Sequence, residues 1–145
     1  RMMSSVSELR AVANMTPEIY QALLPWVTVW PQAPQPLNIN TAPAMVLRSI
    51  NAEKDLSPLS EAEGESLAEY RDEAGFKDKT DFLANPVFEG RRDKMKEIAK
   101  LLGVQTSYFL LQAEVEVAGR NMRLYSVLDR SNRKISALAK ASGSL

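Results

Sequence analysis

Residues 37–43 read LNINTAP and hold the strongest local signal in the chain. Thr41 is placed to cap a helix, because its hydroxyl can accept a hydrogen bond from the first backbone N–H groups, which have no partner inside a helix. Pro43 fits the first turn for the same reason, since it lacks only an N–H that the helix does not use. Apolar residues then recur at helical spacing at Val46, Leu47 and Ile50. The motif therefore predicts a sharply specified start for an apolar helix.

Three more helices are predicted downstream. Ser60 and Glu63 have the spacing of a capping box, in which each side chain satisfies a free backbone N–H of the other residue. Gly75 is predicted to end this helix, because glycine readily adopts the left-handed conformation found after helix C-termini. Thr80 is predicted to cap a short helix. Residues 91–102 place apolar side chains at i, i+3, i+4 and i+7, which predicts another helix.

The N-terminal end is predicted to form two short helices. Residues 5–13 begin with a second pair at capping-box spacing, and residues 16–18 (Thr-Pro-Glu) form a compact start signal for a helix that Pro25 ends. The side chains expected to face inward from this second helix are Ile19, Leu23, Tyr20 and Leu24. Trp26 and Trp30 are predicted to be buried anchors, because large aromatic surfaces usually stabilise small cores.

The hydrophobic period changes from helix to strand near the C-terminal end. Apolar and polar residues alternate across 108–117, which predicts a half-buried antiparallel strand. Residues 118–121 supply a turn and a second alternating run continues to Leu128, so the two strands are predicted to form a hairpin. Residues 131–132 can turn the chain again into a third strand at the sheet edge. This strand is expected to hold Ile135, Ala137 and Ala139 at alternate positions, with Lys134 and Lys140 toward water.

Composition bounds the size and the chemistry of the protein. The 145 residues are 45% hydrophobic, which suits one modest domain or two small lobes with a shared core. Equal totals of 18 basic and 18 acidic residues give no net attraction to a polyanion. The absence of Cys and His removes disulfides, thiolate metal sites and a histidine general base. No carboxylate pair is backed by a nucleophile, a metal motif or a glycine-rich phosphate loop, so catalysis is not expected.

One uncharged segment could suggest a membrane span. Residues 19–47 contain five prolines, however, and these would leave too many backbone groups unpaired in lipid. The chain begins with Arg1 and without a signal sequence. It is therefore expected to be part of a longer protein whose targeting and anchoring segments lie upstream.

The middle of the chain resembles the minor pseudopilins of the K type in type II secretion. Four motifs carry this resemblance: N-I-N-T-A at 38–42, an S-E-A helix start at 60–62, a Y-R-x-x-x-G-F turn at 70–76 and a D-F-L helix at 81–83. The resemblance is looser toward both ends and continues through residues 107–115.

This resemblance implies an α+β architecture. Residues 1–104 would form part of a SAM-like, helix-hairpin-helix α-domain. Residues 105–140 would form the closing antiparallel strands of a pilin-like sheet, as a hairpin or a three-strand meander, and a frayed tail would follow at 141–145. The anchor helix, the earlier strands and the start of the α-domain are expected to lie outside this chain.

The resemblance also implies a structural function. Proteins of this family are anchored in the bacterial inner membrane by an N-terminal helix, project into the periplasm and cap the pseudopilus tip together with the I-type and J-type minor pseudopilins. The chain is therefore expected at the periplasmic face of the inner membrane. No cofactor is expected apart from calcium, which the family is associated with. The available oxygen donors include Glu61, Glu63, Asp72 and Glu73, but no D-x-D-x-D-G loop is present and no ligand is assigned.

A DNA-binding module is the alternative, because the N-I-N-T-A opening also resembles helix-hairpin-helix modules of DNA-uptake and repair proteins. Those modules hold a phosphate in a G-[IV]-G turn. The corresponding connection here, residues 51–60, has no glycine and carries Glu53 and Asp55. Carboxylates at this place would repel DNA, so no nucleic-acid partner is expected.

Two groups of site residues follow. The first group is expected to determine the fold and not to bind a ligand: Asn38, Asn40, Thr41 and Pro43. The second is a candidate partner interface: Arg120, Arg123, Tyr125 and Arg130. A three-stranded sheet with one apolar face is not self-sufficient, so its exposed edge or hairpin face is expected to pack against another subunit or against the pilin helix.

Overall fold

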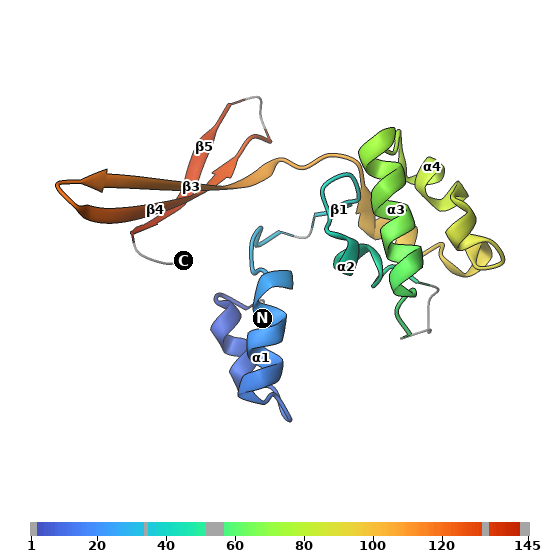
Figure 1. The fold of residues 1–145 in the computed structure, drawn as a ribbon, viewed down its shortest axis with the longest axis horizontal. Helices are drawn as coiled ribbons and strands as arrows, with labels where there is room; N and C mark the ends of the chain where they lie inside the picture. Colours follow the sequence, from blue (N-terminus) through green and yellow to red (C-terminus); the bar gives the residue numbers. More distant parts are fainter. Residues whose placement is uncertain (1–2, 34, 52–56, 132–133, 143–145) are drawn as a thin grey trace. The chain divides into compact units, whose positions relative to one another are not determined.

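Figure 1 shows the computed structural model, which describes residues 3–33, 35–51, 57–131 and 134–142. The chain divides into two compact units, Arg1–Val104 and Gln105–Leu145. The first unit holds the helices and a two-stranded parallel sheet, and the second holds a three-stranded antiparallel sheet. The predicted α+β class is confirmed, whereas the SAM-like, helix-hairpin-helix description stays a prediction.

Two short helical segments begin the first unit, and both start where the sequence predicts. The 3-10 helix η1, Val6–Ala11, begins at the capping box of Ser5. Helix α1, Pro17–Leu23, begins at Thr16, whose hydroxyl accepts a hydrogen bond from the third helical N–H. The 3-10 helix η2, Leu24–Trp26, continues directly from α1.

Burial in this N-terminal part is low. Tyr20 is the one buried side chain among the described residues 3–33. The predicted inward face of α1 is therefore only partly right, since Ile19 is 46% exposed. The predicted burial of both tryptophans is wrong: Trp26 is 43% exposed and Trp30 is half-buried. Two short helices offer too little apolar surface to enclose large aromatic side chains.

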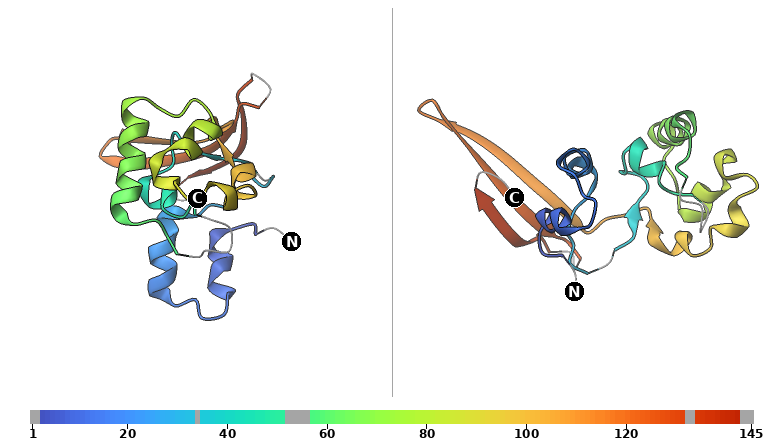
Figure 2. Two further views of the ribbon diagram at one scale, coloured as in Figure 1. Left: turned by 90° about the vertical axis from the view of Figure 1, so that its right-hand side faces the viewer. Right: turned by 90° about the horizontal axis from the view of Figure 1, so that it is seen from below.

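Residues 37–104, which we call the α-domain core, contain the remaining helices. In chain order the elements are β1 (Leu37–Asn38), α2 (Ala44–Leu47), α3 (Glu61–Glu73), α4 (Lys79–Ala84), the 3-10 helices η3 (Pro86–Phe88), η4 (Arg92–Lys94) and η5 (Ile98–Leu101), and β2 (Leu102–Gly103). Helix α2 packs against α3, as the views in Figures 1 and 2 show. One cluster of buried apolar side chains joins these elements: Ile39, Ala42, Leu47, Ile50, Leu59, Leu67, Phe76, Phe82, Phe88, Met95 and Leu102.

Aromatic rings run through the middle of this cluster. Phe82 lies between Phe76 and Phe88, with ring centroids 4.9 Å away on each side. Tyr70 on α3 stacks on the outer side of Phe76, at 5.0 Å. Tyr70 and Phe76 are stacked, Phe76 and Phe82 meet edge to face, and Phe82 and Phe88 are tilted; edge-to-face contacts suit the charge distribution of aromatic rings. Turns and short helices are thereby held together by side chains and not by long regular elements.

A two-residue parallel strand pair closes the α-domain core. Leu37 lies opposite Leu102, and the Ile39 N–H donates to the Gly103 carbonyl at 2.9 Å. The first and last residues of the core are therefore joined by backbone hydrogen bonds, which periodicity in the sequence does not indicate.

Two predictions for the second half of the core are wrong. The predicted cap Thr80 lies inside α4, because the Asp78 carboxylate two residues earlier accepts from both the Thr80 and Asp81 N–H groups, at 2.7 and 2.9 Å. The predicted helix over 91–102 is broken into η4 and η5, with Met95 as the buried residue between them. Leu102, the last residue of the predicted helix, lies in strand β2 instead.

The second unit is an antiparallel meander in the order β3-β4-β5, so the predicted hairpin and third strand are confirmed. The strands are β3 (Tyr108–Val117), β4 (Arg120–Asp129) and β5 (Ser136–Ser142). The predicted four-residue turn is shorter, because the chain reverses at Ala118 and Gly119 alone, with φ of 51° and 74°. Two left-handed residues give the turn whose twist matches a hairpin.

The third strand differs from its prediction in register and in length. A register shift at Val127 and Leu128 of β4 places Ala139 opposite one and Ala137 opposite the other, so these two alanines lie on different faces. The strand also continues through Ser142, two residues into the expected tail, and residues 143–145 lie outside the described residues. Asn132 of the predicted turn also lies outside the described residues.

Candidate interaction surface

The four motif residues lie at the start of the α-domain core. The Asn38 side-chain oxygen accepts from the Asn40 N–H at 3.0 Å, which turns the chain directly after β1. Pro43 is the residue that precedes α2, and it makes no side-chain cap. The predicted capping by Thr41 is wrong, because its hydroxyl donates to the Asn38 carbonyl at 3.4 Å. The asparagine turn places Thr41 too early in the chain to reach the helix N–H groups.

Asn40 makes the long-range contact of the motif. Its Nδ2 donates to the Phe76 carbonyl and its Oδ1 accepts from the Phe76 N–H, both at 2.8 Å. One amide side chain thus satisfies both backbone groups of a residue 36 positions later, in the manner of a strand partner. This bond holds the turn after α3 against the chain entering α2.

The packing of α2 on α3 depends on a close approach at Gly64. A methyl group there would collide with Arg48 Cγ and meet the Ala44 carbonyl at 3.4 Å. Arg48 Nε in turn donates to the Leu59 carbonyl at 3.0 Å. The two helices are thereby fixed by a glycine contact and by a side chain that spans them.

The connection between these helices, which the DNA alternative invokes, is described only at its ends. The buried Asn51 donates from Nδ2 to the Ser57 carbonyl at 2.7 Å. Glu53 and Asp55 lie outside the described residues. The described ends of this connection are therefore held together by a buried side chain.

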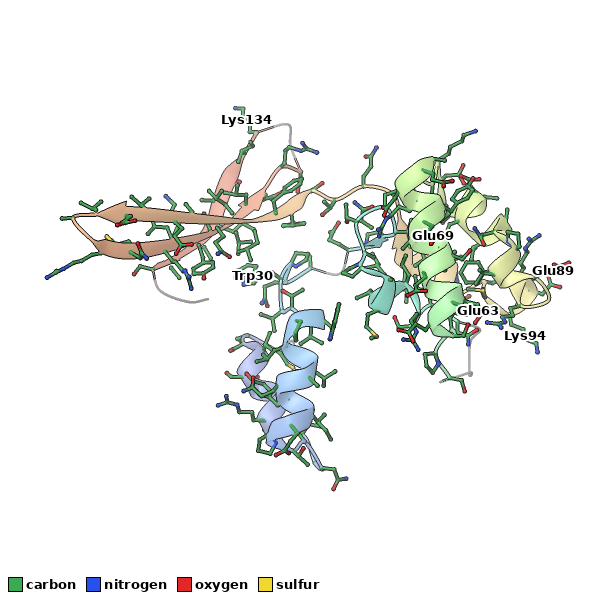
Figure 3. The ribbon with its side chains drawn as sticks, in the orientation of Figure 1. Trp30, Glu63, Glu69, Glu89, Lys94 and Lys134 are labelled. Carbon is green, nitrogen blue, oxygen red and sulfur yellow. The ribbon has the colours of Figure 1, made fainter. Side chains whose placement is uncertain are left out.

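The acidic side chain of Glu63 caps the N-terminus of α3. Glu63 accepts from the Ser60 N–H at 2.7 Å, which confirms the predicted capping box, and pairs with Arg91 at 3.0 Å. Hydrogen bonding from the Ser60 backbone is the main cause that lowers the pKa of Glu63, with Arg91 adding to it. Figure 3 shows Glu63 and Glu69 at separate positions along α3.

Metal ligands do not gather in the described part of the chain. Asp72, one of the predicted oxygen donors, pairs with Arg71 at 2.8 Å. Across the described ranges, no three or more Asp, Glu, His or Cys side chains come together in a way that could hold a metal ion. No helix in those ranges has the length and hydrophobicity that a membrane crossing requires.

One face of the sheet is apolar and solvent-accessible, and we call it the open apolar face. Cross-strand pairing puts alternate residues of β3 on the same side as their partners in β4, for example Val115 opposite Met122. Six large side chains of this face are each at least 40% exposed: Phe109, Leu111, Val115, Val117, Met122 and Leu124. Their alternation fits the sequence prediction, but the predicted half-burial is not reached in this chain.

The four predicted interface residues do not form one patch. Arg120 lies opposite Val117 and so belongs to the rim of the open apolar face. Arg123 and Tyr125 lie on the other face, where Arg123 pairs with Glu114 at 3.2 Å. Arg130 follows β4, and its guanidinium lies 5.0 Å from the centre of the Phe109 ring. Their role at an interface stays a prediction.

The exposed apolar residues of the open face are not among the four predicted interface residues. The signal was present, because the alternation over 108–117 and 122–128 identifies one side of each strand. Periodicity indicates which side of a strand is apolar, but it does not indicate whether a neighbour covers that side.

Two family models, both described as type II secretion system protein K, match residues 37–105 and residues 1–32. The first match almost coincides with the α-domain core. A type II secretion system protein K from Pectobacterium carotovorum subsp. carotovorum is 23% identical over 141 residues, which are 97% of this chain and 42% of that protein.

A solved structure has the same fold. It is a chain in the crystal structure of the GspK-GspI-GspJ complex from the type 2 secretion system of enterotoxigenic Escherichia coli, at a TM-score of 0.78 and 24% identity. The likeness covers 100% of this chain and 50% of that one, so the chain spans half or less of the length of the relatives described. From the two family matches, at residues 1–32 and 37–105, it follows that this chain belongs to the type II secretion system protein K family.

Proposed function

We propose that this chain is a C-terminal, periplasmic portion of a K-type minor pseudopilin. In this role it is a non-enzymatic subunit that assembles with the I-type and J-type minor pseudopilins at the tip of the pseudopilus, and so starts or caps the filament during protein secretion. Family membership supports the proposal, as does the fold shared with a chain of the GspK-GspI-GspJ complex. The intact protein would be held at the periplasmic face of the inner membrane by a helix that precedes this chain. The role requires no cofactor.

The observation that carries the proposal is the open apolar face. Six large apolar side chains gathered on one face are unusual for a surface that stays in water, and such patches mark sites of protein contact. Three strands with one uncovered apolar face are also marginal alone. The sheet therefore functions as a part of something larger, with its apolar side covered by another subunit or by the pilin helix.

Charged residues at the edge of this face suit a rim. Arg120 beside Val117 and Lys140 opposite Ser126 lie at its periphery. Rim charges set orientation and the rate of association more than affinity. We propose that Arg120 and Arg130 act in this way, and that Arg123 and Tyr125 on the other face form a separate contact.

The first test mixes the protein with the soluble domains of candidate I-type and J-type minor pseudopilins and follows the mass of the complex by light scattering. Duplex DNA is titrated in parallel. A stoichiometric protein complex without DNA binding is expected. Saturable DNA binding without a protein complex would reject the tip-subunit role and favour the DNA-binding alternative.

Matched variants then locate the contact. Leu111→Asp places a charge on the open apolar face, and Gln112→Asp places the same charge on the other face of the same strand. We expect Leu111→Asp alone to abolish the complex while circular dichroism stays unchanged. If both variants still form the complex, the open apolar face is not a subunit contact. An unchanged affinity of the Arg123→Glu, Tyr125→Ala double variant would remove the contact on the other face.

A further inference from the structure

A surface hollow of about 400 Å³ is formed by η1, α1 and the connection between them, and we call it the Arg10 hollow. The connection turns at Asn14, whose φ of 64° is a left-handed conformation that asparagine tolerates. The Met15 N–H donates to the Val12 carbonyl at 3.1 Å and closes this turn. The two short helices then lie against each other. The residues that line the hollow are Arg10, Met15, Thr16, Pro17, Tyr20 and Gln21.

The Arg10 hollow combines an apolar inner side with one positive charge. Tyr20 is only 7% exposed and Met15 is half-buried. The Arg10 guanidinium lies 4.4 Å from the centre of the Tyr20 ring, which is within the range of a cation–π contact. Within the described residues, no carboxylate pairs with this guanidinium, and none of its N–H groups has a hydrogen-bond acceptor. The ring therefore positions a cation whose donors are available.

The two acidic residues of the same region are engaged at helix starts. Glu8 and Glu18 are the only Asp or Glu residues in 1–36. Glu8 accepts from the Ser4 N–H at 2.7 Å and completes the capping box of η1. Hydrogen bonding from its own backbone, and then from Thr16, lowers the pKa of Glu18. Both carboxylates thus have local partners, and neither pairs with Arg10 in the described structure.

We propose that the Arg10 hollow binds a carboxylate side chain of a partner protein, with a neighbouring apolar group of that partner against Tyr20 and Met15. A guanidinium presents parallel N–H donors that match the two oxygens of a carboxylate. A phosphate group carries nearly two negative charges at neutral pH and would call for a second cation. Arg10 is the one basic residue in 3–33, so the hollow suits a single carboxylate better.

The exposure of the lining residues favours a protein side chain over a small molecule. Pockets for small molecules bury most of the surface of their ligand. Four of the six lining residues here are exposed: Arg10, Thr16, Pro17 and Gln21. A side chain that projects from another protein surface needs no deeper enclosure. The inference goes beyond the proposed function and is tested without any other pseudopilin, so the two fail separately.

Two matched peptides test the proposal in a titration followed by NMR. The acidic probe is N-acetyl-Leu-Glu-Leu amide, and the neutral probe is N-acetyl-Leu-Gln-Leu amide, which differs only in the carboxylate. Each is added to the unsubstituted protein, to Arg10→Gln and to the control Arg120→Gln, which removes an arginine of β4 in the other unit. The signals followed are the Arg10 side-chain N–H and the backbone N–H groups of Met15, Tyr20 and Gln21. Signal dispersion reports whether each variant is folded.

We expect saturable shifts of these signals and an affinity for the acidic peptide at least about tenfold higher than for the neutral one. Arg10→Gln should abolish this preference, and Arg120→Gln should retain it. Equal affinities of the two peptides for the unsubstituted protein, or no saturable shift with either, would overturn the proposal even if Arg10→Gln failed to fold. A preference that persists in folded Arg10→Gln would place the carboxylate elsewhere and overturn it as well.

Inorganic phosphate is the third titrant, and it separates a carboxylate site from a general anion site. We expect phosphate to shift the same signals at least about tenfold more weakly than the acidic peptide, because it offers no apolar group to Tyr20 and Met15. Equal affinities for phosphate and for the acidic peptide would overturn the proposed carboxylate recognition in favour of unspecific anion binding.

Discussion

The α-domain core buries its apolar side chains, whereas the sheet leaves most of its large apolar side chains exposed. In the core, side chains from helices and from the segments that connect them enclose one another, and Phe82 is fully buried. In the sheet, β3 and β4 are long and pair with each other along their full length, yet Phe109 remains 40% exposed. Regular secondary structure therefore does not by itself produce a buried core. Among the described residues, the irregular region encloses its apolar side chains, and the regular one leaves an apolar face exposed.

The largest expected effect compares the same substitution in the two regions. Phe82→Ala removes a ring between two others and should cost about 3 to 5 kcal/mol of unfolding free energy, whereas Phe109→Ala should cost less than about 1 kcal/mol. Denaturation by urea, followed by circular dichroism, measures both. Equal losses of unfolding free energy would show that the open apolar face is already packed in this chain, and the two regions would then not differ in burial.

The next effect tests how the core is closed. Asn40→Ala leaves the Phe76 N–H and carbonyl without their partner and should cost about 2 to 3 kcal/mol. Asn40→Asp keeps the acceptor but loses the donor, so it should destabilise as well. Asn121→Ala on the exposed hairpin is the control, with an expected change within about 0.5 kcal/mol. Similar unfolding midpoints for the two alanine variants would show that the Asn40 link is dispensable.

A smaller effect is expected at the contact of α2 with α3. Gly64→Ala pushes a methyl group toward Arg48, whose side chain must move away from the Leu59 carbonyl, and should cost about 1 to 2 kcal/mol. Ser66→Ala, at an exposed position of α3, should be neutral or slightly stabilising because alanine favours helix. Thermal unfolding of both variants decides the matter; a stabilised Gly64→Ala protein would mean that the helices can separate freely.

The smallest effect concerns pH. The pKa of Glu63 is lowered in the folded protein, chiefly by hydrogen bonding from the Ser60 backbone, so folding favours its ionised form. Its contribution to stability is present above the ordinary glutamate pKa of about 4.3 and is lost as the pH falls below it. Glu63→Gln should therefore shrink the drop in melting temperature between pH 7 and pH 3. An identical drop in the variant would assign the acid sensitivity to other carboxylates, of which Asp78 at the start of α4 is the first candidate.

Predictions from the sequence succeeded where a few neighbouring residues decide the outcome. The capping box at Ser60 and the alternation in β3 act within one turn or one strand, and both are confirmed. The cap at Thr80 failed within the same range, because Asp78 competes for the same N–H groups and a carboxylate accepts two of them. Local rules identify candidates, and competition between close neighbours selects among them.

The remaining errors have a long-range cause. The last residue of the predicted helix over 91–102 lies in a strand, because it pairs with Leu37, more than 60 residues earlier in the chain. The hydrogen bond between Asn40 and Phe76 spans 36 positions, and the periodicity of the sequence does not indicate it. For the candidate site, alternation identified the apolar side of the sheet, but only coordinates could show that this side is uncovered here. Burial depends on neighbours, and a neighbour in another part of the polypeptide or in another subunit cannot be seen from local pattern.

The β3–β4 hairpin outlasts its third strand, and this unequal length has a mechanical consequence (Figure 2). Strand β5 pairs with Leu124–Asp129, so Arg120–Arg123 have only β3 beside them among the described residues. At about 3.3 Å per residue, this two-stranded tip reaches roughly 13 Å past the braced part of the sheet. Such a two-stranded tip is held by the rest of the sheet at one end only. The rate of amide hydrogen exchange at Arg120–Arg123 should therefore fall when another protein surface binds to this tip.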